Sequence, residues 1–120
     1  MCLILVAWRQ HPDFPLVVAA NRDEFFARPT AAAARWDDAP QVLAGRDLEA
    51  GGTWLGVAAN GRFAAVTNVG EPGVPPGRLS RGKLTRDFLT GGDSPGTYLA
   101  SVDPGAYSGF NLLVGDADQL

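Results

Sequence analysis

The sequence predicts an α+β fold built on largely antiparallel sheets. Two pairs of apolar runs are each separated by a turn, two helical segments follow them, and one more apolar run comes last. Strands grouped before helices in this way are typical of the α+β class. With 120 residues, of which 46% are hydrophobic, the chain is long and apolar enough to bury a core.

The first hairpin is expected from the apolar runs 2–8 and 15–20, which flank a polar His-Pro-Asp turn. Both runs are rich in Leu, Val and Ala, so we expect this hairpin to be buried on both faces. The second hairpin joins residues 53–59 to 62–69 across Asn60-Gly61. An Asn-Gly pair between apolar runs is the strongest short-range hairpin signal.

The second half of the chain predicts a loop, two helices and a strand. Residues 70–77 contain three prolines and three glycines, which favour an exposed or site-bordering loop. A helix is expected to begin at Ser80, to present Leu84, Phe88 and Leu89 on one face, and to end at the glycines 91–92. A second short helix is expected from Ser94, and residues 110–116 predict a strand.

The last predicted strand is followed only by the four residues ADQL. A strand cannot close a sheet alone, so residues 1–120 are expected to be the N-terminal portion of a single domain that is truncated at its C-terminus. An uncovered sheet edge and apolar face would then favour dimers, higher oligomers or aggregates.

Composition excludes several classes of function. The net charge of −3 gives no general attraction to nucleic acid or anionic lipid. His11 and Cys2 are the only histidine and cysteine, which argues against a metal site, and the GxGxxG and P-loop patterns are absent. Residues 2–8 are too short for a membrane span and lack a basic leader, so a cytoplasmic protein is expected.

Cys2 directly follows the initiator Met1 and has no histidine partner that could activate it. If Met1 is removed, the new α-amino group lies on the same residue as the thiol and can accept its proton near neutral pH. The alternative is that Cys2 is a small hydrophobe at the head of a buried strand. Position and composition alone favour this alternative.

A polar run, Asn21-Arg22-Asp23-Glu24, ends the second apolar run. An antiparallel hairpin would return this run to the side of Cys2. Asp23 could then hold the α-ammonium, and Arg22 could stabilise a thiolate or bind an anionic substrate. Strand alternation predicts Asn21 and Asp23 on one side and Arg22 and Glu24 on the other. The alternative is an exposed strand end with a weak surface ion pair.

Two more residues are candidates for binding a substrate. Trp54 follows two glycines that permit close backbone approach, and it could wall a pocket, although tryptophan is more common in a core. Arg81 belongs to a basic stretch with Arg78, Lys83 and Arg86 that could hold a phosphate or carboxylate. The alternative for this stretch is a solvated helix face.

Several blocks of sequence resemble one known family. NRDE after MCLI, then AGRDLEAGGTWLGV, TNV, SRGKLTRDFL and SGFNLLVGD occur in this order from Met1 to Asp116. They resemble the NRDE family, also called the transport and Golgi organisation protein 2 family, whose members are about twice this length. The resemblance implies an N-terminal nucleophile hydrolase-like αββα fold, in which two antiparallel sheets are sandwiched between helical layers.

The better-understood relatives of that fold are bile salt hydrolases and penicillin V acylases, which cleave amide bonds with an N-terminal cysteine. The resemblance therefore implies Cys2 as the nucleophile. Asn21 and Asp23 fit the Asn-x-Asp part of an Arg-Asn-x-Asp run in those enzymes, whereas Ala20 stands where the arginine is expected and Arg22 is displaced.

The same relatives use an asparagine after a second hairpin to bind the oxyanion, and Asn68 occupies the corresponding place. From the residues alone, a turn-initiating asparagine is the preferred interpretation of Asn68. The implied function is thiol-dependent hydrolysis of the C–N amide bond of a small acyl-bearing molecule, without a cofactor.

The resemblance to eukaryotic members implies an alternative, a non-enzymatic carrier of haem or an acyl lipid. Candidate axial ligands for haem are Cys2, His11, Tyr98 and Tyr107.

Overall fold

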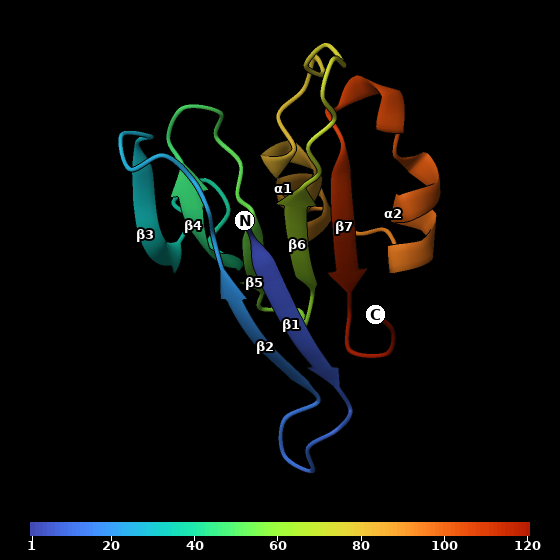
Figure 1. The fold of residues 1–120 in the computed structure, drawn as a ribbon. Helices are drawn as coiled ribbons and strands as arrows, with labels where there is room; N and C mark the ends of the chain where they lie inside the picture. The colour runs from blue at the N-terminus through green and yellow to red at the C-terminus, as the bar shows by residue number, and fades with distance from the viewer.

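The computed structural model describes residues 1–120 and places them in layers (Figure 1). β1 (Leu3–Trp8) and β2 (Leu16–Asn21) form a two-stranded antiparallel sheet. The second sheet is antiparallel and contains, in order, β3 (Thr30–Arg35), β4 (Val42–Asp47), β5 (Leu55–Ala58), β6 (Phe63–Asn68) and β7 (Phe110–Gly115). The predicted α+β class with two antiparallel sheets is confirmed.

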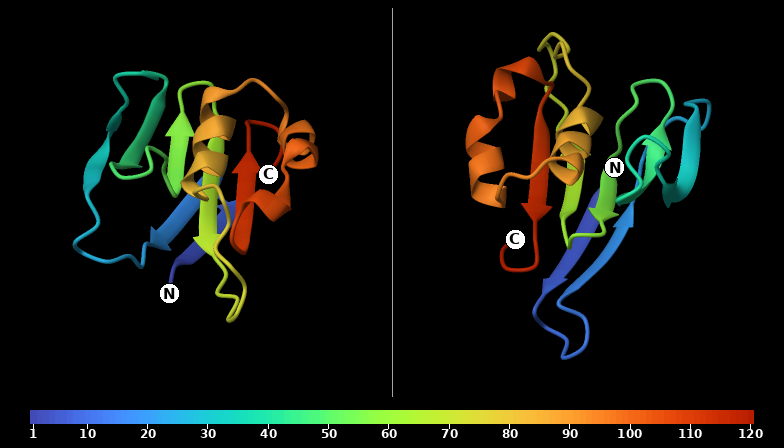
Figure 2. Two further views of the ribbon diagram at one scale, coloured as in Figure 1. Left: turned by 90° about the horizontal axis from the view of Figure 1, so that it is seen from above. Right: turned by 180° about the vertical axis from the view of Figure 1, so that it is seen from behind.

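The helices lie on one face of the larger sheet and the β1–β2 hairpin crosses the other (Figure 2). The helices are α1 (Gly82–Thr90) and α2 (Pro95–Ser101), and a 3-10 turn at Pro104–Ala106 leads from α2 to β7. Neither helix has the length and apolar character needed to cross a membrane.

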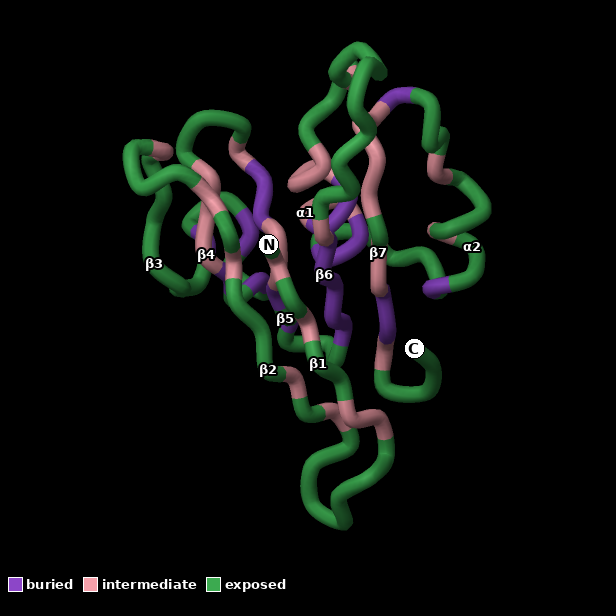
Figure 3. The backbone as a smooth tube through the Cα atoms, viewed as in Figure 1, coloured by how far each residue is buried: buried purple, intermediate pink, exposed green.

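The first hairpin has the predicted strands, and its register runs from Leu3 opposite Asn21 to Trp8 opposite Leu16. The expectation that both its faces are buried is wrong. Leu5 is 59% exposed and Val17 is 44% exposed, and most of the hairpin lies at the surface (Figure 3). One face turns toward the larger sheet, whereas no layer within residues 1–120 covers the other face.

The predicted β5–β6 hairpin is present, and the geometry of its turn explains why an Asn-Gly pair occurs there. The amide of Ala58 donates to the Arg62 carbonyl at 2.8 Å, and the amide of Gly61 donates to the Ala58 carbonyl at 3.0 Å. Gly61 has a φ of 84°, so it takes the left-handed position of a three-residue hairpin loop.

Residues 30–47 contain β3 and β4, two strands that were not predicted from the sequence. β3 reads TAAAAR, and alanine is depleted in strands, so the local signal is weak. β3 is exposed along its whole length and its register shifts between Ala31 and Ala34, as expected of an edge strand. Pairing with β4 therefore fixes its conformation.

Helix α1 starts slightly later than predicted, at Gly82, with Arg81 at the N-cap and no side-chain capping bond. Ser80 contributes its carbonyl instead, which accepts from the Lys83 amide at 3.0 Å. The predicted end at Gly91 is confirmed. α2 is capped as expected, since the Ser94 hydroxyl accepts from the Thr97 amide at 3.2 Å.

The core lies between α1 and the larger sheet. Leu84, Phe88 and Leu89 are all at most 1% exposed, which confirms the predicted apolar face of the helix. Burial of one such side chain contributes about 1.5–3 kcal/mol, so this face anchors the helix to the sheet. The main buried cluster consists of nine residues: Trp36, Ala39, Val42, Ala44, Ala58, Ala64, Phe88, Leu89 and Val114.

The predicted last strand is β7, which pairs with β6 from Phe63 opposite Gly115 to Asn68 opposite Phe110. It forms the edge of the larger sheet opposite β3.

Candidate functional site

A cleft of about 300 Å³ opens where the β1–β2 hairpin, the end of β6 and the segment before α1 meet. Six of the seven residues predicted for the site line it. They are Cys2, Arg22, Asp23, Trp54, Asn68 and Arg81; the other lining residues are Glu24, Arg28, Asp47, Thr53, Val66, Gly77, Arg78, Leu79, Ser80, Gly82 and Ser108. The seventh candidate, Asn21, is not among the lining residues.

The hairpin places the polar run beside the thiol, as predicted, because Leu3 pairs with Asn21. The backbone amide of Asp23 donates to Sγ of Cys2 at 3.2 Å, and the carbonyl of Asp23 lies 3.9 Å from the same sulfur. The carboxylate of Asp23 forms an ion pair with the terminal ammonium of Met1. Asn21 holds the same terminus, since its amide donates to the Met1 carbonyl at 3.1 Å.

The alternation expected beyond Asn21 does not occur, because β2 ends at that residue. Arg22, Asp23 and Glu24 all line the cleft. Strand geometry had instead predicted Asp23 on the opposite side from Arg22 and Glu24. Once the chain leaves the strand, successive side chains are no longer forced to opposite faces.

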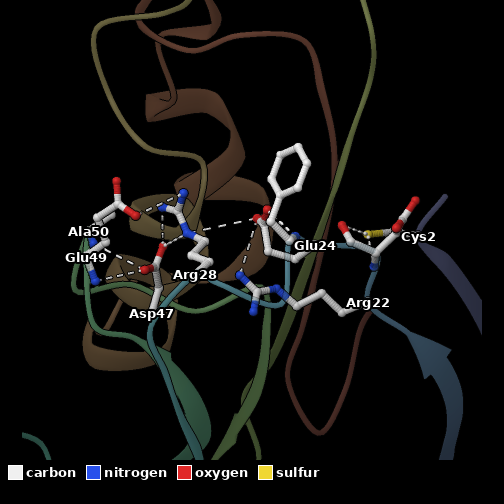
Figure 4. Close-up of polar contacts among 9 residues, drawn as sticks. Cys2, Arg22, Glu24, Arg28, Asp47, Glu49 and Ala50 are labelled. Carbon is white, nitrogen blue, oxygen red and sulfur yellow. Dashed lines mark hydrogen bonds and ion pairs between the residues drawn. The ribbon is translucent and has the colours of Figure 1, made fainter.

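A chain of charged groups extends from Arg22 away from Cys2 (Figure 4). The Arg22 guanidinium points toward Glu24, 3.5 Å from its carboxylate, rather than toward the thiol. Glu24 also lies 3.9 Å from Arg28, and Arg28 contacts Asp47 at 2.7 Å. Arg22 and Arg28 therefore already have acidic partners.

Asp47 accepts hydrogen bonds from three residues of this part of the structure. Burial acts to raise the pKa of its carboxyl group, but hydrogen bonds from Arg28 and from the Glu49 and Ala50 amides outweigh burial and hold the pKa below its ordinary value. The hydrogen bond to Asp47 in turn raises the pKa of Arg28. Both groups stay charged across the physiological range.

Arg28 and Asp47 line the cleft but were not predicted from the sequence. The β3–β4 register, with Thr30 opposite Asp47, brings Arg28 next to Asp47. Only recognition of these two strands could have predicted the pair, and the alanine-rich sequence of β3 hides them.

The Gly-Gly-Thr-Trp segment joins the cleft to α1. The position that a Cβ of Gly52 would occupy is 2.4 Å from the carbonyl carbon of Gly82, so only glycine permits this contact. The Thr53 amide donates to the Gly82 carbonyl at 3.2 Å. The next residue, Trp54, is half-buried and lines the cleft. The predicted close backbone approach is thus present, and it faces the start of α1.

Arg78 and Arg81 lie on the α1 side of the cleft. Arg78 is exposed, and Arg81 is half-buried with Nη1 donating to the Gly109 carbonyl at 2.9 Å. Neither takes part in an ion pair. Asn68 is exposed at the end of β6 and lines the same cleft.

An apolar groove of about 270 Å³ lies between the β1–β2 hairpin and the larger sheet, and Cys2 lines it as well. Seven of its nine lining residues are hydrophobic. The lining residues are Cys2, Leu3, Ile4, Val6, Ala65, Thr67, Asn111, Leu112 and Leu113.

The other residues considered as haem ligands lie outside the cleft and the groove. His11 is at the tip of the first hairpin, where Nδ1 accepts from the Asp13 amide at 3.1 Å. The Tyr98 hydroxyl donates to the Leu84 carbonyl at 2.6 Å, and burial raises the pKa of this phenol. Tyr107 packs edge-on against Phe110. No three His, Cys, Asp or Glu side chains are grouped as a metal site.

Comparison with known proteins gives a consistent result. The model of the transport and Golgi organisation 2 family matches residues 1–120. The Transport and Golgi organization 2 homolog of Mus musculus is 38% identical over 97% of this chain and 45% of its own length. The Bos taurus homolog is 39% identical over the same shares, and the Drosophila melanogaster protein is 36% identical over 99% of this chain and 48% of its own.

The chain thus spans about half the length of the curated relatives it matches. The family predicted from the NRDE and following blocks is confirmed. This chain belongs to the transport and Golgi organisation 2 family.

Proposed function

We propose that this protein is an N-terminal cysteine hydrolase with an N-terminal nucleophile hydrolase-like αββα fold, acting on the C–N amide bond of a small acyl-bearing molecule in the cytoplasm. One observation carries the proposal: Asp23 contacts both the Cys2 thiol, through its backbone amide, and the terminal ammonium, through its carboxylate. An N-terminal nucleophile needs its thiol and its amine held together in this way.

Removal of Met1 would create the α-amine of Cys2 within reach of Asp23, because adjacent residues are only about 3.8 Å apart. That amine takes the thiol proton as Sγ attacks the carbonyl carbon of the substrate. The C–S bond forms, the C–N bond breaks, and the proton passes to the leaving amine. Water then attacks the thioester, the carboxylic acid leaves, and the thiol regains a proton.

Negative charge develops on the carbonyl oxygen during both steps. The Asn68 side chain, which lines the cleft with Cys2, is assigned to donate to this oxygen. Asp23 positions the amine, Trp54 forms a wall, and the cationic groups Arg22 and Arg81 contact polar parts of the substrate. Asn21 acts indirectly, since it holds the backbone of the terminal residue.

The test is a panel of N-acyl amides assayed with the full chain and with Cys2→Ser and Cys2→Ala variants. Both substitutions should abolish turnover while leaving circular dichroism unchanged, since Cys2 is only half-buried. Ser101→Ala is the control for a neutral substitution outside the cleft, because Ser101 is exposed at the end of α2. Full turnover by the Cys2→Ala variant would rule out Cys2 as the nucleophile.

A carrier of an acyl lipid or haem is the second candidate, favoured by the apolar groove and by the exposed hydrophobic side chains of the first hairpin. Haem titration distinguishes it from the hydrolase. A stoichiometric Soret shift that Cys2→Ala abolishes, with no turnover on any amide, would support the carrier and contradict the hydrolase.

A further inference from the structure

We propose that Asp47, acting through Arg28 and Glu24, positions Asp23 against the Cys2 thiol. The three charged side chains are positioning residues, because they hold the backbone that contacts the sulfur. This positioning role rests on the proposed hydrolase function, whose nucleophile it keeps in place, although its test needs no turnover.

Asp23 lies beyond the part of the chain that strand pairing fixes. β2 ends at Asn21, two residues earlier. The Asp23 amide donates to Sγ of Cys2 at 3.2 Å. The amides on either side, of Arg22 and Glu24, form no backbone hydrogen bond. The ladder of the first hairpin therefore does not by itself hold Asp23 at the sulfur.

Apolar packing does not hold residues 22–29 either. Phe25 is 84% exposed and Phe26 is fully exposed, so neither aromatic ring anchors this segment. The half-buried residues of the segment are Arg22, Glu24 and Arg28, and its other five residues are exposed. The side chains through which the segment packs on the rest of the molecule are therefore the charged ones.

Arg28 attaches this segment to β4. Its guanidinium donates to Oδ2 of Asp47 from Nε at 3.2 Å and from Nη2 at 2.7 Å. The Arg28 amide also donates to the Phe25 carbonyl at 3.0 Å, and the Leu48 amide donates to the Pro29 carbonyl at 3.0 Å. Because Asp47 is the last residue of β4, the larger sheet fixes where Arg28 lies.

Glu24 extends this attachment to the residue beside Asp23. Its carboxylate lies between two cations, 3.9 Å from Arg28 and 3.5 Å from Arg22 (Figure 4). The same carboxylate accepts from the Phe25 amide at 2.9 Å, which ties the side chain to its own backbone. Asp23 and Glu24 share a planar peptide group, so a fixed Glu24 restricts Asp23 as well.

Hydrogen exchange of the Asp23 amide, followed by nuclear magnetic resonance on the full chain, measures this contact directly. Sγ of Cys2 is the acceptor of that amide, so Cys2→Ala gives the exchange rate without the contact. Glu24→Gln keeps the size of the side chain and removes its charge. It should raise the Asp23 rate about threefold to fivefold over the wild type, as expected for the loss of partly exposed ion pairs.

Glu49→Gln is the matched control. Glu49 also pairs with Arg28, at 3.4 Å, but its side chain is exposed and lies outside the segment that carries Asp23. The charge change is the same as in Glu24→Gln, and the Asp23 rate should equal that of the wild type.

The Val66 amide reports the general stability of the fold, because it donates to the Trp54 carbonyl at 2.8 Å in the larger sheet. Its exchange rate in Glu24→Gln should equal that of the wild type. Equal acceleration of the Asp23 and Val66 amides would show a general loss of stability and would overturn the positioning role.

A double-mutant cycle tests whether Asp47 acts through Glu24. Asp47→Asn should raise the Asp23 rate at least as much as Glu24→Gln does, and the double variant should match Asp47→Asn. Arg28→Gln should act like Asp47→Asn, and Arg28→Lys should recover part of the effect because it retains a cation. If Arg28→Gln fails to fold, Glu24→Gln still tests the proposal, since Glu24 is at the end of the chain of contacts.

The outcomes separate positioning from hydrolysis. An unchanged Asp23 rate in Glu24→Gln, or effects that multiply in the double variant, would contradict the positioning role whatever the amide assay shows. The expected exchange pattern in a protein without turnover would support the positioning role and contradict hydrolysis.

Discussion

The backbone amide of Asp23 donates a hydrogen bond to Sγ of Cys2 at 3.2 Å, although the two residues are separated by 21 positions. The register of the first hairpin, with Leu3 opposite Asn21, makes this contact. Because the Asp23 carboxylate also pairs with the terminal ammonium, one residue links the thiol to the chain terminus. Processing of that terminus is therefore the first property to examine.

Met1 should be absent from the protein isolated from its own host. An α-amine joined to methionine is an amide with no basic lone pair, so an N-terminal nucleophile requires removal of Met1. Met1 is 92% exposed and therefore accessible to an aminopeptidase. Intact-mass spectrometry measures the loss, and retention of Met1 in the native protein would exclude catalysis by the N-terminal amine.

Asp23→Asn should slow amide turnover about 10²-fold or more without preventing removal of Met1. The variant keeps the backbone amide that contacts Cys2 but loses the negative charge that holds the ammonium. Steady-state kinetics and mass spectrometry report the two properties separately. Asp13→Asn at the hairpin tip is the matched control and should be as active as the wild type, since Asp13 is exposed and outside the cleft.

Asn68→Ala should lower kcat by about 10²–10³, as loss of one oxyanion donor does, and should leave the free energy of unfolding nearly unchanged. The side chain is exposed, so its removal creates no cavity. Asn68→Asp should be slower still, because a carboxylate repels the developing oxyanion. An Asn68→Ala variant with normal kcat would remove this residue from the mechanism.

Asp47→Asn should reduce the free energy of unfolding by about 1–3 kcal/mol at pH 7, since it weakens charged hydrogen bonds to Arg28. The folded-state pKa of Asp47 lies below the ordinary value of 3.8. Its contribution is therefore complete above that value and is lost as the pH falls through the folded-state pKa.

In urea titrations, the wild type should exceed Asp47→Asn by the full difference from pH 7 down to about pH 4, and this difference should shrink as the pH falls further. Asp118→Asn is the control, because this exposed carboxylate lies outside the cleft. A stability difference that stays constant with pH would show that the charge of Asp47 is not what stabilises the pair.

Arg62→Met should destabilise the fold by about 2–4 kcal/mol, because it leaves two carbonyl groups without charged donors. The Arg62 side chain is buried over the Phe88 ring, and it donates to the carbonyls of Phe88 and Asp93, both at 2.8 Å. Urea denaturation measures the change. Arg62→Lys should recover part of the lost stability. If Arg62→Met lowers the free energy of unfolding by less than about 0.5 kcal/mol, the hydrogen bonds from Arg62 to these carbonyls are unimportant for stability.

The sequence by itself determined the features that depend on neighbouring residues. The Asn60-Gly61 turn, the Ser94 cap and the apolar face of α1 are signals within one element, and the structure contains all three. The approach of the polar run to Cys2 was also predictable, because a short hairpin fixes which residues face each other.

Only the tertiary structure decided which surfaces are covered and which distant groups meet. The hairpin strands look buried in sequence, yet Leu5 is exposed, because burial depends on whether another layer packs there. The contact of Arg28 with Asp47 arises from the pairing of β3 with β4, which has little local signal in an alanine-rich strand. Arg78 lines the same cleft as Cys2 for the same physical reason: packing between layers brings together residues that no local sequence pattern relates.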